Sequence, residues 1–126
     1  MKRMVTILVI LFAIVACSIW GLATIHKTNQ VVGAELDKIE TQISQQEYEQ
    51  AEQTASQLCD TWEQKETIFE CYIKHDNVDQ ITRNLARIQM LIAIQDTDEL
   101  MLEIADARYH LQHLYESELP LPGNLL

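Results

Sequence analysis

The chain has 126 residues, enough for one domain with a modest core, and it contains only three glycines and two prolines. All nineteen acidic residues lie at or after Glu35, against seven basic residues from Lys27 onward, so the chain after residue 26 carries about −12. Such an acidic surface argues against nucleic acid as a partner, because it repels phosphate backbones. The scarcity of turn-forming residues favours an all-α fold.

The first 26 residues read as a membrane anchor. No charged side chain occurs from Met4 to Ile25, and a helix of that length reaches about 33 Å, slightly more than the hydrocarbon core of a bilayer. Lys2 and Arg3 precede this segment, and the positive-inside rule then keeps the N-terminus in the cytoplasm and places the body outside. We therefore predict a single-pass cell-membrane protein with a cytoplasmic tip and anchor over residues 1–26.

Two other interpretations of this segment stay open. Residues 14–17, I-V-A-C, match the lipobox of a bacterial lipoprotein, which would make Cys17 the lipidated residue. Against this, the chain stays apolar for eight residues after Cys17, where a lipoprotein usually becomes polar. Residues 21–23, G-L-A, have the small residues of an ordinary cleavage site, but the apolar stretch before them is unusually long. All three interpretations place the chain from about residue 27 outside the cytoplasm.

The body begins with an amphipathic stretch that can continue directly from the anchor. Apolar residues follow each other at steps of four, three and four: Val32, Leu36, Ile39 and Ile43. Ser44 and Glu47 then have the spacing of a capping box, which predicts the start of a second helix. The apolar face of that helix comprises Tyr48, Ala51, Ala55, Leu58, Trp62, Phe69, Tyr72 and Ile73. A polar stretch over residues 63–66 is where this helix would bend or break.

Two further helices follow by the same logic. Asn77 with Gln80, and Asp96 with Glu99, repeat the capping spacing and predict two more helix starts. The apolar faces are Val78, Ile81, Leu85, Ile88, Leu91 and Ile92 for the third helix, and Leu100, Ile104, Ala107, Leu111 and Leu114 for the fourth. Short connections make neighbouring helices antiparallel. We predict an antiparallel helical-hairpin bundle of three or four helices over residues 27–119, and a Pro/Leu-rich tail over 120–126.

Few residues suggest chemistry. Asp106, His110 and His113 fall at i, i+4 and i+7 of one helix and form a weak candidate metal site, although such a spacing is more often a solvated flank. Cys59 and Cys71 would form a disulfide only if the second helix folded back, because twelve residues of continuous helix separate them by about 18 Å. No phosphate loop, nucleophile elbow or HExxH pair is present, so we expect neither an enzyme nor a cofactor.

The order of features resembles a family of small bacterial proteins known as domain of unknown function 4363. The likeness rests on the apolar N-terminus, E-Y-E-Q-A at 47–51, Trp62, K-H-D-N-V-D-Q-I at 74–81, the Asp96 junction and the ending L-P-L-P-G-N-L-L. The resemblance implies an anchored, extracytoplasmic helical protein and supplies no catalytic residues.

These patterns lead to one functional expectation and one alternative. We expect a protein–protein interaction module of the bacterial cell envelope, which binds another envelope protein or a second copy of itself. The alternative is a lipoprotein, lipidated at Cys17, that binds a small ligand or a metal.

Overall fold

A computed structural model of the chain describes residues 1–73 and 75–118. These residues form four helices, α1 (Lys2–Ser44), α2 (Tyr48–Tyr72), α3 (His75–Ala93) and α4 (Thr97–Glu118). No strand occurs within the described ranges. The predicted all-α class, with a long apolar first helix, is confirmed.

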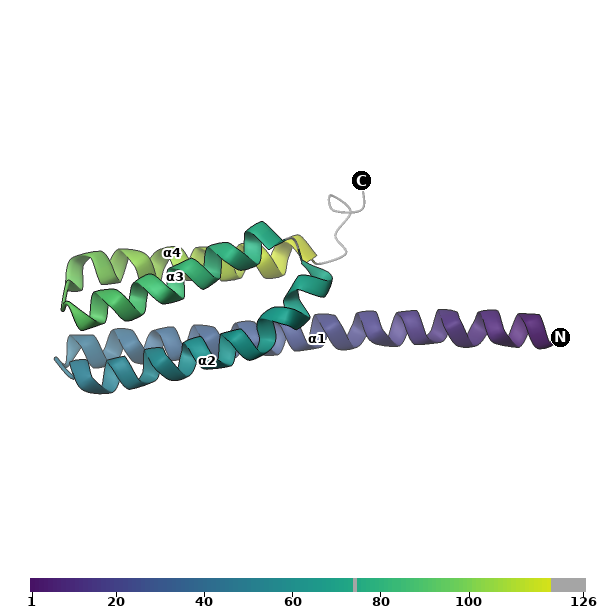
Figure 1. The fold of residues 1–126 in the computed structure, drawn as a ribbon, viewed down its shortest axis with the longest axis horizontal. Helices are drawn as coiled ribbons and strands as arrows, with labels where there is room; N and C mark the ends of the chain where they lie inside the picture. The colour runs from purple at the N-terminus through teal and green to yellow at the C-terminus, as the bar shows by residue number, and fades with distance from the viewer. Residues whose placement is uncertain (74, 119–126) are drawn as a thin grey trace.

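The helices form an up-down-up-down bundle (Figure 1). Each helix packs on two neighbours, in the order α1, α2, α3, α4 and back to α1, and across the described residues the diagonal pairs do not approach each other. The turns at residues 45–47 and 94–96 lie together at one end of the bundle, which we call the distal end. The end of α2, the start of α3 and the last turn of α4 lie at the opposite, proximal end, where α1 emerges.

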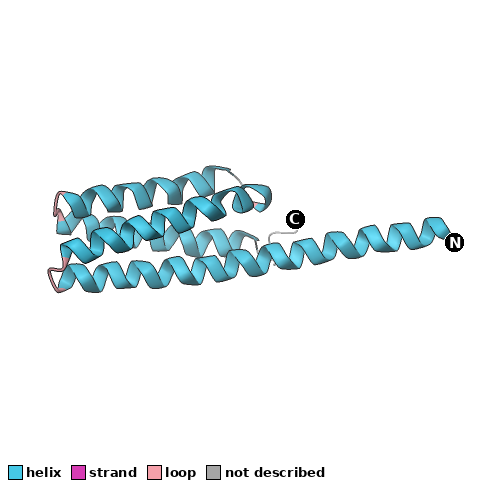
Figure 2. Ribbon diagram, turned by 60° about the horizontal axis from the view of Figure 1, so that its bottom comes forward, coloured by secondary structure: helices cyan, strands magenta, loops and turns pink. Residues whose placement is uncertain are grey.

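Helix α1 has two parts with different surroundings (Figure 2). Residues 2–20 are exposed and project beyond the bundle, whereas every third or fourth residue from Gly21 onward is buried. The helix continues through residue 26 without a break, so the predicted amphipathic stretch and the apolar segment belong to one rod. Such a rod leaves no flexible linker between the apolar segment and the bundle.

The core consists mainly of residues that the helical periodicity predicts, and it also includes Ile25, which the sequence assigned to the anchor. Trp62 and Phe69 are each 1% exposed, and their ring centroids lie 4.9 Å apart. The indole Nε1 of Trp62 donates a hydrogen bond of 2.8 Å to Thr82 Oγ1, which ties α2 to α3. Tyr48 is only partly buried at the edge of the core, and the side chain of Tyr72 lies outside the described part. Helix α2 runs unbroken through residues 63–66, where the polar sequence allowed a break.

Both distal turns have the same backbone geometry. Gln46 and Gln95 adopt left-handed conformations, with φ of 61° and 58°. The N–H of the next residue reaches back to a carbonyl five positions earlier, from Glu47 to Gln42 at 2.8 Å and from Asp96 to Leu91 at 3.1 Å. This pattern is the Schellman motif, which ends a helix by satisfying its last carbonyl groups.

The structure corrects two of the three predicted helix caps. Ser44 is the last residue of α1 and its hydroxyl donates to the Glu40 carbonyl within that helix, so it does not cap α2. Helix α3 begins at His75, which places Asn77 inside the first turn. In α1 the apolar stripe continues to Ile43, which is buried in the core. In α3 the helix starts two residues earlier with His75 and Asp76, both exposed, and the carboxylate of Asp76 suits the first turn of a helix. The third cap is confirmed, since the Glu99 N–H donates to Asp96 Oδ1 at 3.3 Å.

Candidate functional site

The two ends of the bundle differ in charge. The distal half, residues 33–60 and 84–107, contains twelve acidic residues and two basic ones, a net charge of −10. The proximal half, residues 21–32, 61–83 and 108–118, contains seven acidic and five basic residues and all four histidines. The acidic body follows from the sequence, but this division does not, because it appears only when the antiparallel hairpins bring the two acidic segments to the same end.

The distal half also carries a groove and exposed apolar side chains. The groove, between α2 and α3, has a volume of about 490 Å³ and is lined by Glu49, Glu52, Gln53, Ser56, Gln89 and Ala93. On α3, in the adjoining turn and on α4, three large apolar side chains are 57–65% exposed: Met90, Ile94 and Leu102. Carboxylates beside apolar groups suit a cationic, amphipathic segment of another protein.

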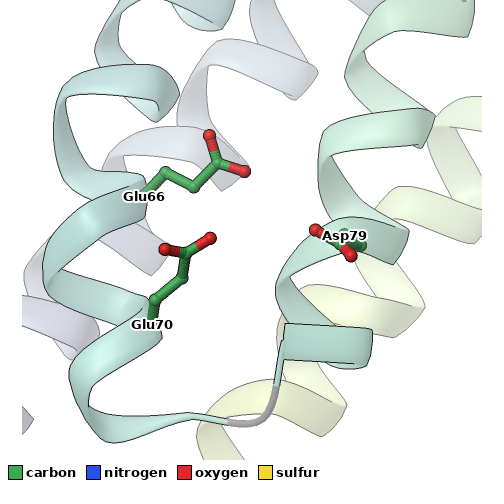
Figure 3. A group of neighbouring side chains, drawn as sticks. All are labelled: Glu66, Glu70 and Asp79. Atoms are coloured by element: carbon green, nitrogen blue, oxygen red, sulfur yellow. The ribbon is translucent and has the colours of Figure 1, made fainter.

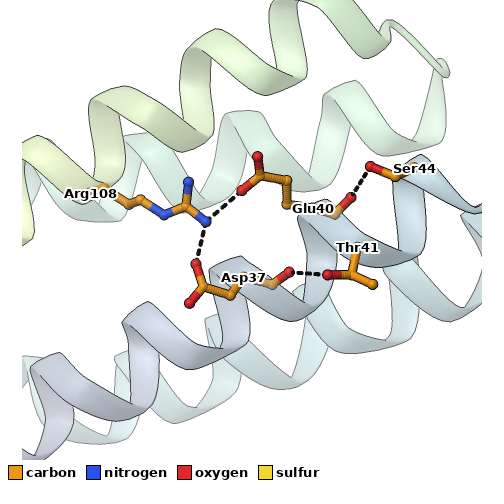
Figure 4. Close-up of polar contacts among 5 residues, drawn as sticks. All are labelled: Asp37, Glu40, Thr41, Ser44 and Arg108. Atoms are coloured by element: carbon orange, nitrogen blue, oxygen red, sulfur yellow. Dashed lines mark hydrogen bonds and ion pairs between the residues drawn. The ribbon is translucent and has the colours of Figure 1, made fainter.

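An ion pair closes the seam between α1 and α4 (Figure 4). The guanidinium of Arg108 donates to Glu40 Oε2 at 2.6 Å and also to Asp37 Oδ1. Burial alone would lower the pKa of Arg108, but the hydrogen bonds and charges of Glu40 and Asp37 raise it above its ordinary value. Arginine is charged at any ordinary pH, and here its guanidinium bridges the first and last helices.

A second groove, of about 470 Å³, follows the proximal part of the same seam. Asn29 lies in its lining and donates from Nδ2 to the Leu111 carbonyl at 2.9 Å, which links α1 to α4. The Asn29 Oδ1 atom is buried and has no hydrogen-bond partner within the described chain. Water entering this open groove can satisfy that acceptor.

The structure brings together two of the three predicted metal ligands, around a residue that sequence analysis did not single out. Asn84 is 2% exposed and donates to Glu103 Oε1 at 2.7 Å and to Asp106 Oδ2 at 2.9 Å. Its Oδ1 lies 3.1 Å from His110 Nδ1, so the ring carries its proton on that nitrogen. His113 lies apart, stacked on Tyr109 with centroids 6.0 Å apart. The sequence feature that could have predicted a buried Asn84 is its position within the apolar stripe of the third helix.

Three other carboxylates converge between α2 and α3 (Figure 3). The ligand atoms of Glu66, Glu70 and Asp79 all lie within 4.8 Å of one another. Glu66 also accepts from Thr82 Oγ1 at 3.1 Å, and Glu70 lies 3.5 Å from His75 Nδ1. Sequence spacing relates only Glu66 to Glu70, at i and i+4, whereas Asp79 joins them through the α2–α3 pairing. Glu70 is exposed, and exposed acidic groups often lie close together without a bound ion.

The three cysteines are separate from one another. Cys59 and Cys71 lie on the unbroken α2 and are not bonded, because the fold-back that a disulfide requires does not occur. Cys17 is exposed on the projecting part of α1. Burial, together with the negative charges of Glu63 and Asp60, raises the pKa of the half-buried Cys59 thiol. Cys71 is exposed and is the thiol of the bundle most open to reagents.

The model of a protein family, the domain of unknown function DUF4363, matches residues 19–124. The chain matches no curated protein and no solved structure. The family match covers the whole described bundle and most of the chain. The protein therefore belongs to the DUF4363 family.

Proposed function

We propose that this protein is a membrane-anchored, extracytoplasmic interaction module that binds another protein of the cell envelope through the distal end of its bundle. The observation that carries the proposal is the polarity of the molecule along α1. An exposed apolar rod occupies one end, and a surface of net charge −10 with exposed apolar groups occupies the other.

The anchor is supported by the length and exposure of α1. Among the described residues this is the one helix long and apolar enough to cross a membrane, and only 6% of its most apolar window is buried in the bundle. Lys2 and Arg3 precede that window, which favours a cytoplasmic N-terminus. Because α1 is continuous into the bundle, an anchored protein would hold its distal end away from the bilayer surface.

The binding role is supported by the surface of the distal half. Its carboxylates attract a basic partner over a distance of about 8–10 Å at physiological ionic strength, which accelerates association. Met90, Ile94 and Leu102 supply apolar area for close contact once the partner arrives. We therefore propose a partner with a cationic, amphipathic segment.

Topology can be tested with the native thiols. In intact bacterial cells, a membrane-impermeant maleimide should label Cys71, and a Cys71→Ser variant should lose most of the signal, since the raised pKa of Cys59 slows its reaction. As a control, Lys2→Cys in a chain without the native cysteines should react only after the cells are opened. Protection of Cys71 until lysis would place the bundle in the cytoplasm and overturn the proposal.

Partner binding can be tested with matched charge reversals. Glu52→Lys with Glu99→Lys changes exposed sites of the distal half, and Glu63→Lys with Asp76→Lys makes the same change in the proximal half. After chemical crosslinking and detergent extraction, the native chain and the proximal variant should recover the same envelope protein, and the distal variant should lose it. Equal recovery by both variants, or recovery of nothing but this chain in several detergents, would count against the distal surface.

The chemical form of the anchor needs a separate measurement. The intact mass of the protein extracted from membranes should equal that of the full chain and should change in a Cys17→Ala variant only by the substitution. A mass that starts at Cys17 and includes a diacylglyceryl group, lost in the variant, would identify a lipoprotein. A mass that starts after Ala23 would identify a cleaved signal.

A further inference from the structure

A small hollow lies where the projecting part of α1 meets the bundle. It has a volume of about 290 Å³ and lies between α1 and α2. Its lining includes Trp20, Lys27 and Thr28 from α1, and Thr61 and Lys65 from α2. The hollow exists because the second half of α2 packs beside the part of α1 that follows the apolar segment.

The two lysines make this hollow cationic. Among the described residues neither ammonium group is in an ion pair. Glu66, the residue next to Lys65, is directed toward α3, where its carboxylate accepts a hydrogen bond of 3.1 Å from Thr82. Two positive charges that share one hollow repel each other, and an anion between Lys27 and Lys65 would relieve this repulsion.

Two threonine hydroxyls add hydrogen-bonding capacity to the hollow. Thr28 is 5% exposed and Thr61 is partly buried, and within the described ranges neither hydroxyl has a hydrogen-bond partner. By contrast, the hydroxyl of Thr24, which also lines the hollow, donates to the Trp20 carbonyl at 2.9 Å. A hydroxyl can donate to a phosphate oxygen, and hydrogen bonds to a charged acceptor are the strong ones. Two ammonium groups and two free hydroxyls suit a phosphate group.

The hollow lies at the level of the lipid headgroups if α1 crosses the membrane. Lys27 is two residues beyond Ile25, where the uncharged segment ends, which is about 3 Å along the helix axis. The headgroup layer on each side of a bilayer is about 5–8 Å thick, so Lys27 lies within it. Trp20 is 58% exposed and lies at the level where tryptophan concentrates, between headgroups and acyl chains.

We propose that this hollow binds the phosphate group of an anionic phospholipid in the leaflet on the side of the bundle. Lys27 and Lys65 neutralise the phosphate, and Thr28 and Thr61 donate hydrogen bonds to its oxygens. The proposal rests on the membrane anchoring put forward under Proposed function. A zwitterionic headgroup brings its own cation toward the lysines, so the site should prefer phosphatidylglycerol to phosphatidylcholine. The bound lipid would join α1 to α2 at the membrane surface.

The experiment measures which lipid lies beside Trp20 in the full chain. The protein is placed in nanodiscs of phosphatidylcholine and phosphatidylglycerol, in which an equal, minor share of the lipid carries bromine on its acyl chains. The brominated lipid is phosphatidylglycerol in one sample and phosphatidylcholine in the other, and bromine quenches tryptophan fluorescence on contact. A Trp20→Phe chain gives the contribution of Trp62, which is 1% exposed in the core.

Two pairs of substitutions separate a specific site from general attraction. Lys27→Gln with Lys65→Gln removes both positive charges. Thr28→Val with Thr61→Val removes both hydroxyls and keeps the charges and the shape of the side chains. The first pair should abolish the preference for phosphatidylglycerol, and the second should reduce it, because the phosphate is then held by charge alone.

In the native chain, brominated phosphatidylglycerol should quench Trp20 several-fold more than brominated phosphatidylcholine does. Lys38→Gln with Arg83→Gln removes two positive charges from exposed sites elsewhere in the bundle, and this control should keep the preference. Equal quenching by the two lipids, or a preference that the threonine substitutions leave unchanged, would overturn the site while leaving the anchor intact. A Trp20 that neither brominated lipid quenches would overturn the anchoring itself.

Inorganic phosphate distinguishes the lipid from a soluble ligand. Sodium phosphate, exchanged for sodium chloride at constant ionic strength, should leave the preference unchanged, because a lipid in the same bilayer has a high effective concentration at the hollow. Loss of the preference in phosphate would identify free phosphate as the ligand and would overturn the assignment to a lipid.

Discussion

The distal and proximal ends of the bundle share one hydrophobic core but have different surfaces. At the distal end two Schellman turns of the same geometry close the hairpins, and acidic side chains outnumber basic ones by twelve to two. At the proximal end the charges nearly balance, all the histidines are found, and the apolar part of α1 departs. The net charge of a chain therefore does not describe its surfaces, because hairpin pairing decides which segments lie together.

The strongest test of the comparison asks whether the shared core is one cooperative unit. Trp62→Ala, in the proximal half, and Leu100→Ala, in the distal half, should each lower the free energy of unfolding by about 3–5 kcal/mol, because each leaves a cavity. Urea unfolding of the full chain in detergent, followed by circular dichroism, measures both. We expect a single transition in each variant. Two separate transitions would show that the two ends fold independently and do not share one cooperative core.

A smaller effect is expected at the boundary between the halves. Asn84→Ala removes the amide that Glu103, Asp106 and His110 share, and leaves these groups partly unpaired. The free energy of unfolding should fall by about 1–3 kcal/mol. Asn77→Ala, in the first turn of α3, removes the same amide from a more accessible position and should cost less. An equal loss in the two variants would mean that the buried network adds no stability.

The ion pair at the α1–α4 seam should contribute less. Arg108→Gln removes the bridge to Asp37 and Glu40, but all three side chains are more than a third exposed, so the loss should stay below about 1 kcal/mol. Lys38→Gln removes the same charge from an exposed site on α1 and serves as the control. Unfolding at low and at high salt tests the role of charge, since the excess loss in Arg108→Gln over Lys38→Gln should shrink when salt is added. If the loss of unfolding free energy in Arg108→Gln did not depend on salt, Arg108 would stabilise the protein through packing and not through its charge.

The smallest effect is expected in the distal turns, and it has the opposite sign. Gln95→Gly should raise the free energy of unfolding by about 0.5 kcal/mol, because the left-handed conformation costs an L-residue about 1 kcal/mol and the freedom of glycine in the unfolded chain offsets roughly half. Gln46→Gly should behave alike, since the two turns match. Gln80→Gly, at an exposed position inside α3, should instead destabilise by about 1 kcal/mol. Opposite signs at Gln46 and Gln95 would show that the two turns differ.

Much of the fold could be predicted from the sequence, because the relevant signals are local. The apolar stripes of α2, α3 and α4 predicted most of the buried residues, and the Asp96 cap was correct. The Ser44 and Asn77 caps were wrong, because α1 continues through Ser44 with Ile43 in the core, and α3 already starts at the exposed His75. The candidate metal residues were predicted only as neighbours on one helix. The amide of Asn84, which joins Asp106 and His110, comes from another helix, so residue spacing along a single helix could not predict it.

By itself the sequence determined the helical class, the apolar segment at the N-terminus and the faces that enter the core. These follow from residue type and a period of 3.6, which require no knowledge of distant residues. Only the tertiary structure decided which helices are neighbours, and hence the acidic distal half, the Glu66, Glu70 and Asp79 cluster, and the hollow that Lys27 and Lys65 share. Each of these depends on the register of antiparallel helices, which is set by the interdigitation of side chains far apart in the chain.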